Sequence, residues 1–235
     1  LDCEEREVLA GGIRDGTDLL TIRRSSGPPA DGIGDPVNGR LQLLVNRLNP
    51  NGMYLFMDDT PPATPVLEAS LVQIRDLVVR SYYISNDSLP DPEGELTGRV
   101  IGIPSLRVLS LTDGPDFDDQ ELMRGVEDLQ VQFGYDTGSY DGNVEIDPGF
   151  DEDANGIPDA PNGIATRYVD PGNVPFGFQV VAVRVFVLMR ADQPEQGFVD
   201  DRSYVLGSKK IDPPRDGFRR VLLSRTIQLR NTRTL

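Results

Sequence analysis

The chain has 235 residues, with 38 acidic side chains, 23 basic ones and no histidine, which gives a formal net charge of −15. Such a charge repels nucleic-acid phosphates, so we expect the domain itself to bind no nucleic acid. The single cysteine, Cys3, excludes a disulfide within the chain and a thiolate zinc cluster, and the lack of histidine removes the commonest general base.

Turn-forming residues are abundant, with 24 glycines and 19 prolines, and they predict many short elements rather than a helical bundle. The first residues are polar and leave room for a helical stub at 3–10. Short strands are predicted at 18–24, 41–45, 53–57, 71–84 (as one strand or two), 99–103 and 106–111. Residues 118–124 are predicted to form one or two helical turns.

The strongest strand patterns lie in the second half of the chain. Residues 126–135 alternate between apolar and polar, and 178–189 are apolar on both faces, which is typical of a central strand. Residues 218–229 place Val221, Leu223, Ile227 and Leu229 on one face, with Arg225 as the exception. The predicted fold class is therefore α+β, mostly β, with an antiparallel sheet and long loops in a single domain, 1–235.

Residues 136–177 are acidic and glycine-rich, and we interpret them as a loop insertion in the domain. The stretch 125–166 has ten acidic residues and no basic one, whereas 207–235 has eight basic residues and two acidic ones. Two interpretations stay open. The two stretches attract each other within the fold, or the basic stretch meets an acidic neighbouring subunit. No apolar run reaches the length of about 18 residues that a transmembrane helix needs.

Residues 151–159 (DEDANGIPD) have the spacing of a calcium-binding loop, with oxygen-bearing side chains at positions 1, 3, 5 and 9 and glycine at position 6. The predicted Ca²⁺ ligands are the side chains of Asp151, Asp153, Asn155 and Asp159 and the backbone carbonyl of Ile157. Such a cluster of carboxylates would repel itself without a cation.

The loop departs from an EF-hand in two ways. Asn162 stands where an EF-hand has its bidentate glutamate, and Pro158 prevents a helix from starting at the usual place. The pattern is closer to the calcium loops of extracellular modules. The alternative is a solvated acidic turn, because Asp, Asn and Gly are the residues that any turn uses.

One motif suggests an enzyme but lacks its partner. Asp136-Thr137-Gly138 follows an apolar strand, as in an aspartic protease, yet that chemistry needs two aspartates that share a proton, and the chain has no second copy of the motif. No histidine is present to activate a serine, and no nucleotide-binding glycine motif occurs. We therefore predict no catalytic residues and no enzyme activity.

Three long segments, in the same order, resemble the PilW-like minor pilins of type IV pili. They are 121–136 (ELMRGVEDLQVQFGYD), 180–190 (VVAVRVFVLMR) and 219–231 (RRVLLSRTIQLRN). Two shorter segments, 16–23 (GTDLLTIR) and 82–85 (YYIS), are similar to weaker landmarks of that family. The resemblance thus runs from residue 16 to residue 231.

The resemblance implies a pilin-like head domain that assembles with other minor pilins and the major pilin, primes the filament and lies near its tip. It also implies an inner-membrane anchor through an N-terminal helix, a periplasmic location before assembly and an extracellular one in the pilus. The family's leader and apolar helix are missing from this sequence, so we expect a soluble piece of a longer chain, with Cys3 near the junction.

Two alternatives remain. A pseudopilin of a type II secretion system is similar over 125–133 but lacks the strong closing motif that ends at Asn231. A free calcium-dependent adhesion or carbohydrate-binding module would use the same calcium loop, although sugar-stacking tryptophans are absent from the chain.

Overall fold

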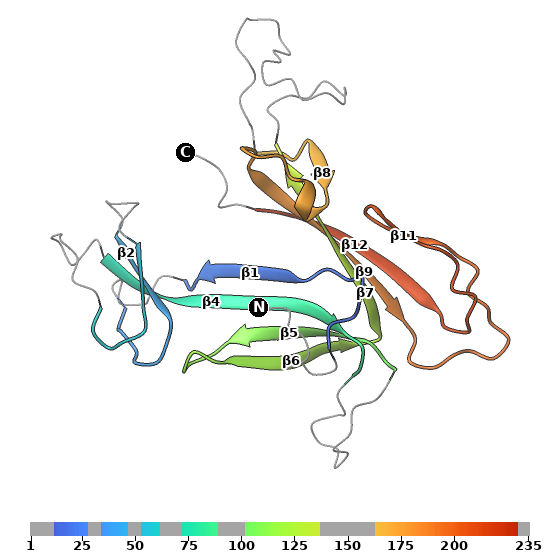
Figure 1. The fold of residues 1–235 in the computed structure, drawn as a ribbon, viewed down its shortest axis with the longest axis horizontal. Coiled ribbons are helices and arrows are strands. Elements are labelled where there is room, and N and C mark those ends of the chain that lie inside the picture. The colour runs from blue at the N-terminus through green and yellow to red at the C-terminus, as the bar shows by residue number, and fades with distance from the viewer. Residues whose placement is uncertain are drawn as a thin grey trace, which may run out of the picture.

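The computed structural model describes residues 12–27, 34–46, 53–61, 72–88, 102–136 and 163–229. Its regular elements are almost all strands, which follow one another along the chain (Figure 1). They are β1 (Leu20–Ser25), β2 (Gln42–Asn46), β3 (Met53–Phe56), β4 (Val72–Ser85), β5 (Ser105–Leu111), β6 (Phe117–Arg124), β7 (Val126–Tyr135), β8 (Arg167–Val169), the 3₁₀ turn η3 (Pro171–Asn173), β9 (Val180–Arg190), β10 (Tyr204–Leu206), β11 (Lys209–Ile211) and β12 (Arg220–Gln228).

The long strand β4 organises the first sheet. Its first half pairs with β2, which pairs in turn with β3, and its second half lies between β1 and β5. β6 completes this sheet beside β5. The second sheet has the order β12-β9-β7-β8, and β10 and β11 form a separate hairpin. All pairings are antiparallel, as expected for strands joined by short turns.

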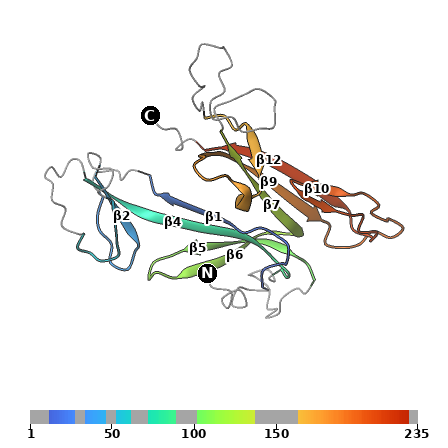
Figure 2. The same cartoon turned by 45° about the horizontal axis from the view of Figure 1, so that its top comes forward.

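The chain passes from the first sheet to the second through one residue, Gly125, between β6 and β7 (Figures 1 and 2). Gly125 has φ +81° and binds both sheets, because its N–H donates to Pro104 and its carbonyl accepts from Arg190, each across 2.8 Å. A Cβ here would lie 2.6 Å from the carbonyl oxygen of Arg190. Only glycine therefore fits this junction.

The main core lies where the two sheets meet. Ile84 of the first sheet packs against Val126 and Leu129 of the second, and all three are buried. Partly buried side chains of β5 and β9 surround them, namely Leu106, Val185, Val187 and Met189. The same face of the second sheet continues onto β12, because Met189 pairs with Val221 and Val187 with Leu223.

A smaller core lies on the opposite face of the second sheet, under the β10–β11 hairpin. Leu188, Tyr204 and Leu206 are buried there, with Phe186, Ile211 and Leu222 packed around them. Because the first sheet covers one face of β9 and the hairpin covers the other, β9 is apolar on both sides. This confirms the prediction of a central strand at 178–189.

The mostly antiparallel β architecture is confirmed, but several details differ from the prediction. Residues 118–124 are not helical; they lie in the edge strand β6, where pairing with β5 outweighs the local preference. Residues 71–84 correspond to the one continuous strand β4, and Gly102 lies in a turn rather than in a strand. Among the described residues, η3 is the only helical element, so the α part of the expected α+β class is not seen there. The proposed stub at 3–10 lies outside them.

Part of the predicted insertion 136–177 belongs to the second sheet. β8 pairs with the end of β7, and η3 follows it directly. The hairpin β10–β11 was not predicted, although Gly207-Ser208 directly after the apolar segment 204–206 is a turn signal. Gly207 adopts φ +65°, as the first residue of such a two-residue turn requires.

Candidate functional site, the outer strand of the second sheet

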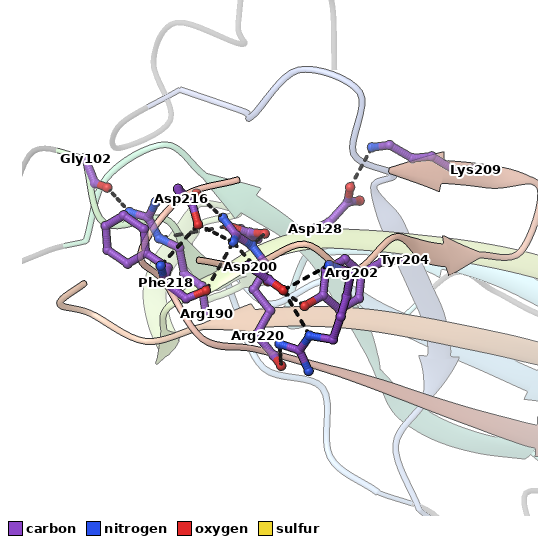
Figure 3. Close-up of polar contacts among 11 residues, drawn as sticks. Gly102, Asp128, Arg190, Asp200, Arg202, Tyr204, Lys209, Asp216, Phe218 and Arg220 are labelled. Atoms are coloured by element: carbon purple, nitrogen blue, oxygen red, sulfur yellow. Dashed lines mark hydrogen bonds and ion pairs between the residues drawn. The ribbon is translucent and has the colours of Figure 1, made fainter. Parts of the chain in front are cut away.

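β12 is fixed at its start by a buried arginine, Arg220 (Figure 3). Its guanidinium donates two hydrogen bonds to Asp216, of 2.7 and 2.8 Å, and two to Glu127 of β7, of 2.5 and 3.4 Å. A further contact of 3.4 Å reaches Asp200. The fork of the guanidinium thus joins the loop before β12 to a strand 93 residues away in sequence.

The second member of this cluster is Asp200, which is fully buried. Burial alone would raise the pKa of its carboxyl, but the hydrogen bonds from Arg202, Tyr204 and Arg220 outweigh burial and lower the pKa to about 2. Burial and the bond to Asp200 raise the pKa of Tyr204 to about 12. At neutral pH the cluster is therefore a charged carboxylate held by a phenol and two guanidinium groups.

Neighbouring contacts tie the same region to the rest of the molecule. The Lys209 Nζ donates to Asp128 Oδ2 and to the Gly16 carbonyl, each across 2.6 Å. Arg190 lies over the ring of Phe218, 4.4 Å from its centroid, and donates to the Gly102 carbonyl (Figure 3). These contacts connect β11 and the loop before β12 to both sheets.

Among the described residues of the basic stretch 207–235, Lys209 pairs with Asp128 of the acidic stretch 125–166, and Arg220 pairs with Glu127. The interpretation that the acidic and basic stretches attract within the fold is confirmed for this pair of contacts. Arg219 also pairs internally, with Glu195. Lys209 and Lys210 lie in the hairpin strand β11.

Beyond its anchored start, β12 exposes apolar side chains. Val221 is 57% exposed, and Leu223 and Ile227 are each 52% exposed. They lie on the face of the second sheet that packs against the first sheet at β7. Because β12 lies two strands away from β7, the first sheet does not cover this face at β12 (Figure 2). Exposed apolar side chains gathered on one element are typical of an interaction surface. We call Val221, Leu223, Arg225 and Ile227 the β12 face.

Arg225 gives the β12 face its charge. It is exposed, and no ion pair of Arg225 is found among the described residues. The other charged residue of the strand, Arg220, is buried and fully matched by carboxylates. The β12 face is therefore apolar with one positive charge, on a chain whose net charge is −15.

A second buried arginine holds the first sheet together. Arg107 of β5 donates from Nε to Tyr83 of β4 across 3.2 Å and to Asp119 of β6 across 3.0 Å. Burial and the hydrogen bond to Asp119 raise the pKa of Tyr83 well above its usual value. These contacts cross three adjacent strands and so stabilise their order.

The predicted calcium ligands Asp151, Asp153, Asn155, Ile157 and Asp159 lie outside the described residues, so calcium binding stays a prediction. Within the described ranges no cluster of three or more His, Cys, Asp or Glu side chains could hold a metal ion. Asp136, the aspartate of the protease-like motif, is buried at the end of β7 and accepts a 2.6 Å hydrogen bond from the Gly163 N–H. It thereby joins the two ends of the segment that contains the calcium motif.

The alternation along 218–229 correctly predicts that Val221, Leu223, Arg225 and Ile227 share one face, but it does not identify them as an exposed surface. Alternation shows which residues share a face, and it does not show which face is covered. Glu127 and Asp200 were also not predicted as partners of Arg220, since they lie 93 and 20 residues away in sequence. The sequence does contain one indication of this cluster. An arginine at the start of an apolar strand, such as Arg220, needs nearby carboxylates when it is buried.

Comparisons with known proteins gave one match. The model of the family described as Type IV Pilus-assembly protein W (PilW) matches residues 81–231, which is more than half of the chain and includes β12. No curated protein and no solved structure matches. Among the described residues, no helix is long and apolar enough to cross a membrane.

Proposed function

The chain belongs to the PilW family of type IV pilus-assembly proteins, and on that basis we propose that it is a minor pilin that acts by binding other pilus subunits. Together with other minor pilins it primes the filament and lies near the filament tip, in contact with the major pilin. Family membership supports a role in pilus assembly and a location in the cell envelope or the pilus. The resemblance of 121–136, 180–190 and 219–231 to minor pilins supports the more specific role.

The observation that carries the proposal is the β12 face. A protein that acts by assembly needs a surface that binds a partner, and such surfaces combine exposed apolar side chains with few charges. Val221, Leu223 and Ile227 supply apolar area, and Arg225 supplies one charge that has no partner among the described residues. The anchored Arg220 holds this strand in place before a partner arrives, which limits the entropy lost on binding.

We further propose that Ca²⁺ stabilises the loop that contains Asp151, Asp153, Asn155, Ile157 and Asp159. The spacing of its oxygen ligands supports this, as does the absence of basic residues from 125 to 166. Asp136 and Gly163 hold the two ends of the loop together. A bound cation would then fix the conformation of a loop whose base is already closed.

The experiment is a binding assay between the purified chain and each pilus-assembly subunit encoded beside it, by isothermal titration calorimetry. We expect binding to at least one subunit, and weaker binding for Leu223→Ser. The matched control is Thr226→Ser, which changes an exposed side chain on the opposite face of the same strand. Binding to none of the subunits would contradict the proposed function. Equal affinity of Leu223→Ser and the unmodified chain would exclude the β12 face as the contact.

A further inference from the structure

The hydrogen-bonding edge of β12, as distinct from its face, can be derived from the ladder with β9. The Ala191 N–H donates to the Arg219 carbonyl at one end of the ladder, and the Leu229 N–H donates to the Val181 carbonyl at the other. Hydrogen-bonded pairs alternate along an antiparallel ladder, and the register is unbroken between these ends. The odd-numbered residues of β12 therefore bond to β9, and the even-numbered residues direct their backbone groups outward.

The outward backbone groups belong to Arg220, Leu222, Ser224, Thr226 and Gln228. The carbonyl of Arg220 is already occupied, since it accepts a 3.2 Å hydrogen bond from Arg202. Ser224, Thr226 and Gln228 are exposed, and their backbone N–H and C=O groups have no partner in the part of the chain that the structure describes. These three residues follow one another on the outer edge of β12, and an added strand could form about two hydrogen-bonded pairs or more with their free backbone groups.

This edge lacks the features that usually protect an edge strand. β6, at the edge of the first sheet, has a register shift between Leu106 and Arg107 of its partner strand and carries several acidic side chains. β12 has no register shift over nine residues, no proline and no glycine, and its one exposed charge is Arg225. A regular edge beside exposed apolar side chains is the geometry that accepts an added strand.

We propose that the edge of β12 from Ser224 to Gln228 binds an extended strand of a neighbouring pilus-assembly subunit, which adds to the second sheet next to β12. This inference rests on the proposed function. The added strand places apolar side chains against Leu223 and Ile227 and an acidic side chain against Arg225. Main-chain hydrogen bonds to the even-numbered residues set its register.

Charge favours a different subunit over a second copy of this chain. Pairing two copies through β12 would bring two Arg225 side chains close together, and it would join two molecules that each carry a net charge of −15. An acidic side chain on a strand of another subunit would instead form a favourable ion pair with Arg225, the one charged residue of the β12 face. The partner is therefore defined by its chemistry, which is an edge strand that alternates apolar residues with an acidic one.

Amide hydrogen exchange measured residue by residue tests this pairing on the intact chain. In the free protein, the amides of Ser224, Thr226 and Gln228 should exchange quickly, whereas those of Leu223 and Arg225 should be protected by β9. With the pilus-assembly subunit that binds in calorimetry, exchange at the three even-numbered amides should slow by about tenfold or more. The odd-numbered amides should change little.

Proline substitution tests the same edge by affinity. Ser224→Pro removes an outward N–H and leaves every hydrogen bond to β9 in place, so the fold is kept. It should weaken binding of the partner by about tenfold or more, while Ser224→Ala binds normally. Arg225→Glu, which keeps all backbone groups, should weaken binding several-fold, and the effect should be largest at low salt. Protection of the odd-numbered amides reports that each variant is folded.

The outcomes separate the two proposals. Binding with fast exchange at Ser224, Thr226 and Gln228, together with affinities of Ser224→Pro and Arg225→Glu equal to that of the unmodified chain, would overturn strand addition and leave the assembly role intact. Binding to none of the neighbouring subunits would overturn both. Concentration-dependent protection of these amides in the chain alone would show that a second copy is the occupant, which contradicts the partner proposed here.

Discussion

Tyr204 donates its phenol hydrogen to Asp200 across 2.6 Å, and both residues are buried. The bond links strand β10 of the hairpin to the loop that leads toward it, while the same carboxylate also faces Arg220 at the start of β12. The hairpin packs on one face of the second sheet, and Arg220 fixes the strand at its edge. The position of the proposed binding strand therefore depends on a buried network of charges and hydrogen bonds.

Removing the central cation of this network should destabilise the protein. Arg220→Met removes the cation that pairs with Glu127 and Asp216 and leaves the buried Asp200 with Arg202 alone, and breaking a buried ion pair from one side typically costs about 3–5 kcal/mol. Urea unfolding measures the loss. The matched control is Arg219→Met at the next position, where the pair with Glu195 is exposed and little change is expected. Equal stability of the two variants would argue against the network as the anchor.

Acid should weaken the same network. Because the pKa of Asp200 is lowered to about 2 in the folded state from its ordinary value of 3.8, its contribution is complete above pH 4. That contribution is lost as the pH falls from about 4 to 2, when the carboxylate is protonated. Asp200→Asn should flatten this part of the stability profile, measured by thermal melts at each pH. Asp216, whose pKa Arg220 also lowers, keeps part of the acid sensitivity. An unchanged slope in Asp200→Asn would contradict the assignment.

The junction between the sheets should tolerate no side chain. Gly125→Ala places a Cβ 2.6 Å from the Arg190 carbonyl oxygen on a backbone with φ +81°, so about 1–3 kcal/mol of stability should be lost. Gly172→Ala is the control, since a Cβ at this position in η3 meets nothing within 4 Å. Guanidinium unfolding compares the two. A Gly125→Ala protein as stable as the control would mean that the junction can relax.

Strand positions were largely predictable because alternation is a local property. Residues 126–135 and 178–189 match β7 and β9 closely, and apolar residues on both faces of 178–189 indicated a strand that is covered on both sides. Residues 118–124 were assigned wrongly as helical because their sequence is rich in residues that favour helices or turns. These residues form a strand because they pair with β5, and a local sequence pattern does not show that pairing.

The candidate site was predictable only in part. The pattern at 218–229 assigned Val221, Leu223 and Ile227 to one face, yet their exposure depends on how far the first sheet reaches across the second. That distance is set by the junction at Gly125 and by tertiary packing, which a local pattern does not contain. The ion pair between Glu127 and Arg220 likewise joins residues 93 positions apart.

Calcium should raise the melting temperature if the loop binds it as proposed. For a dissociation constant of roughly 0.1 mM, calcium at about 1 mM adds about 1.4 kcal/mol to the stability of the folded state. Thermal melts with calcium and with chelator measure the shift, and Asp153→Ala should abolish it. Glu152→Ala removes the same charge from a position that is not a ligand, so it should keep the shift. The absence of any shift, with no heat on calcium titration, would reduce 151–159 to an acidic turn.

The role in pilus assembly is tested most directly by counting surface pili in a strain from which the gene for this protein is cleanly deleted. Membership of the PilW family predicts fewer surface pili with the major pilin still present in the cell, and restoration by the unmodified gene. A complementing gene with Ser224→Pro should restore pili less well than one with Ser224→Ala. Normal numbers of surface pili and normal twitching in the deletion strain would contradict the account.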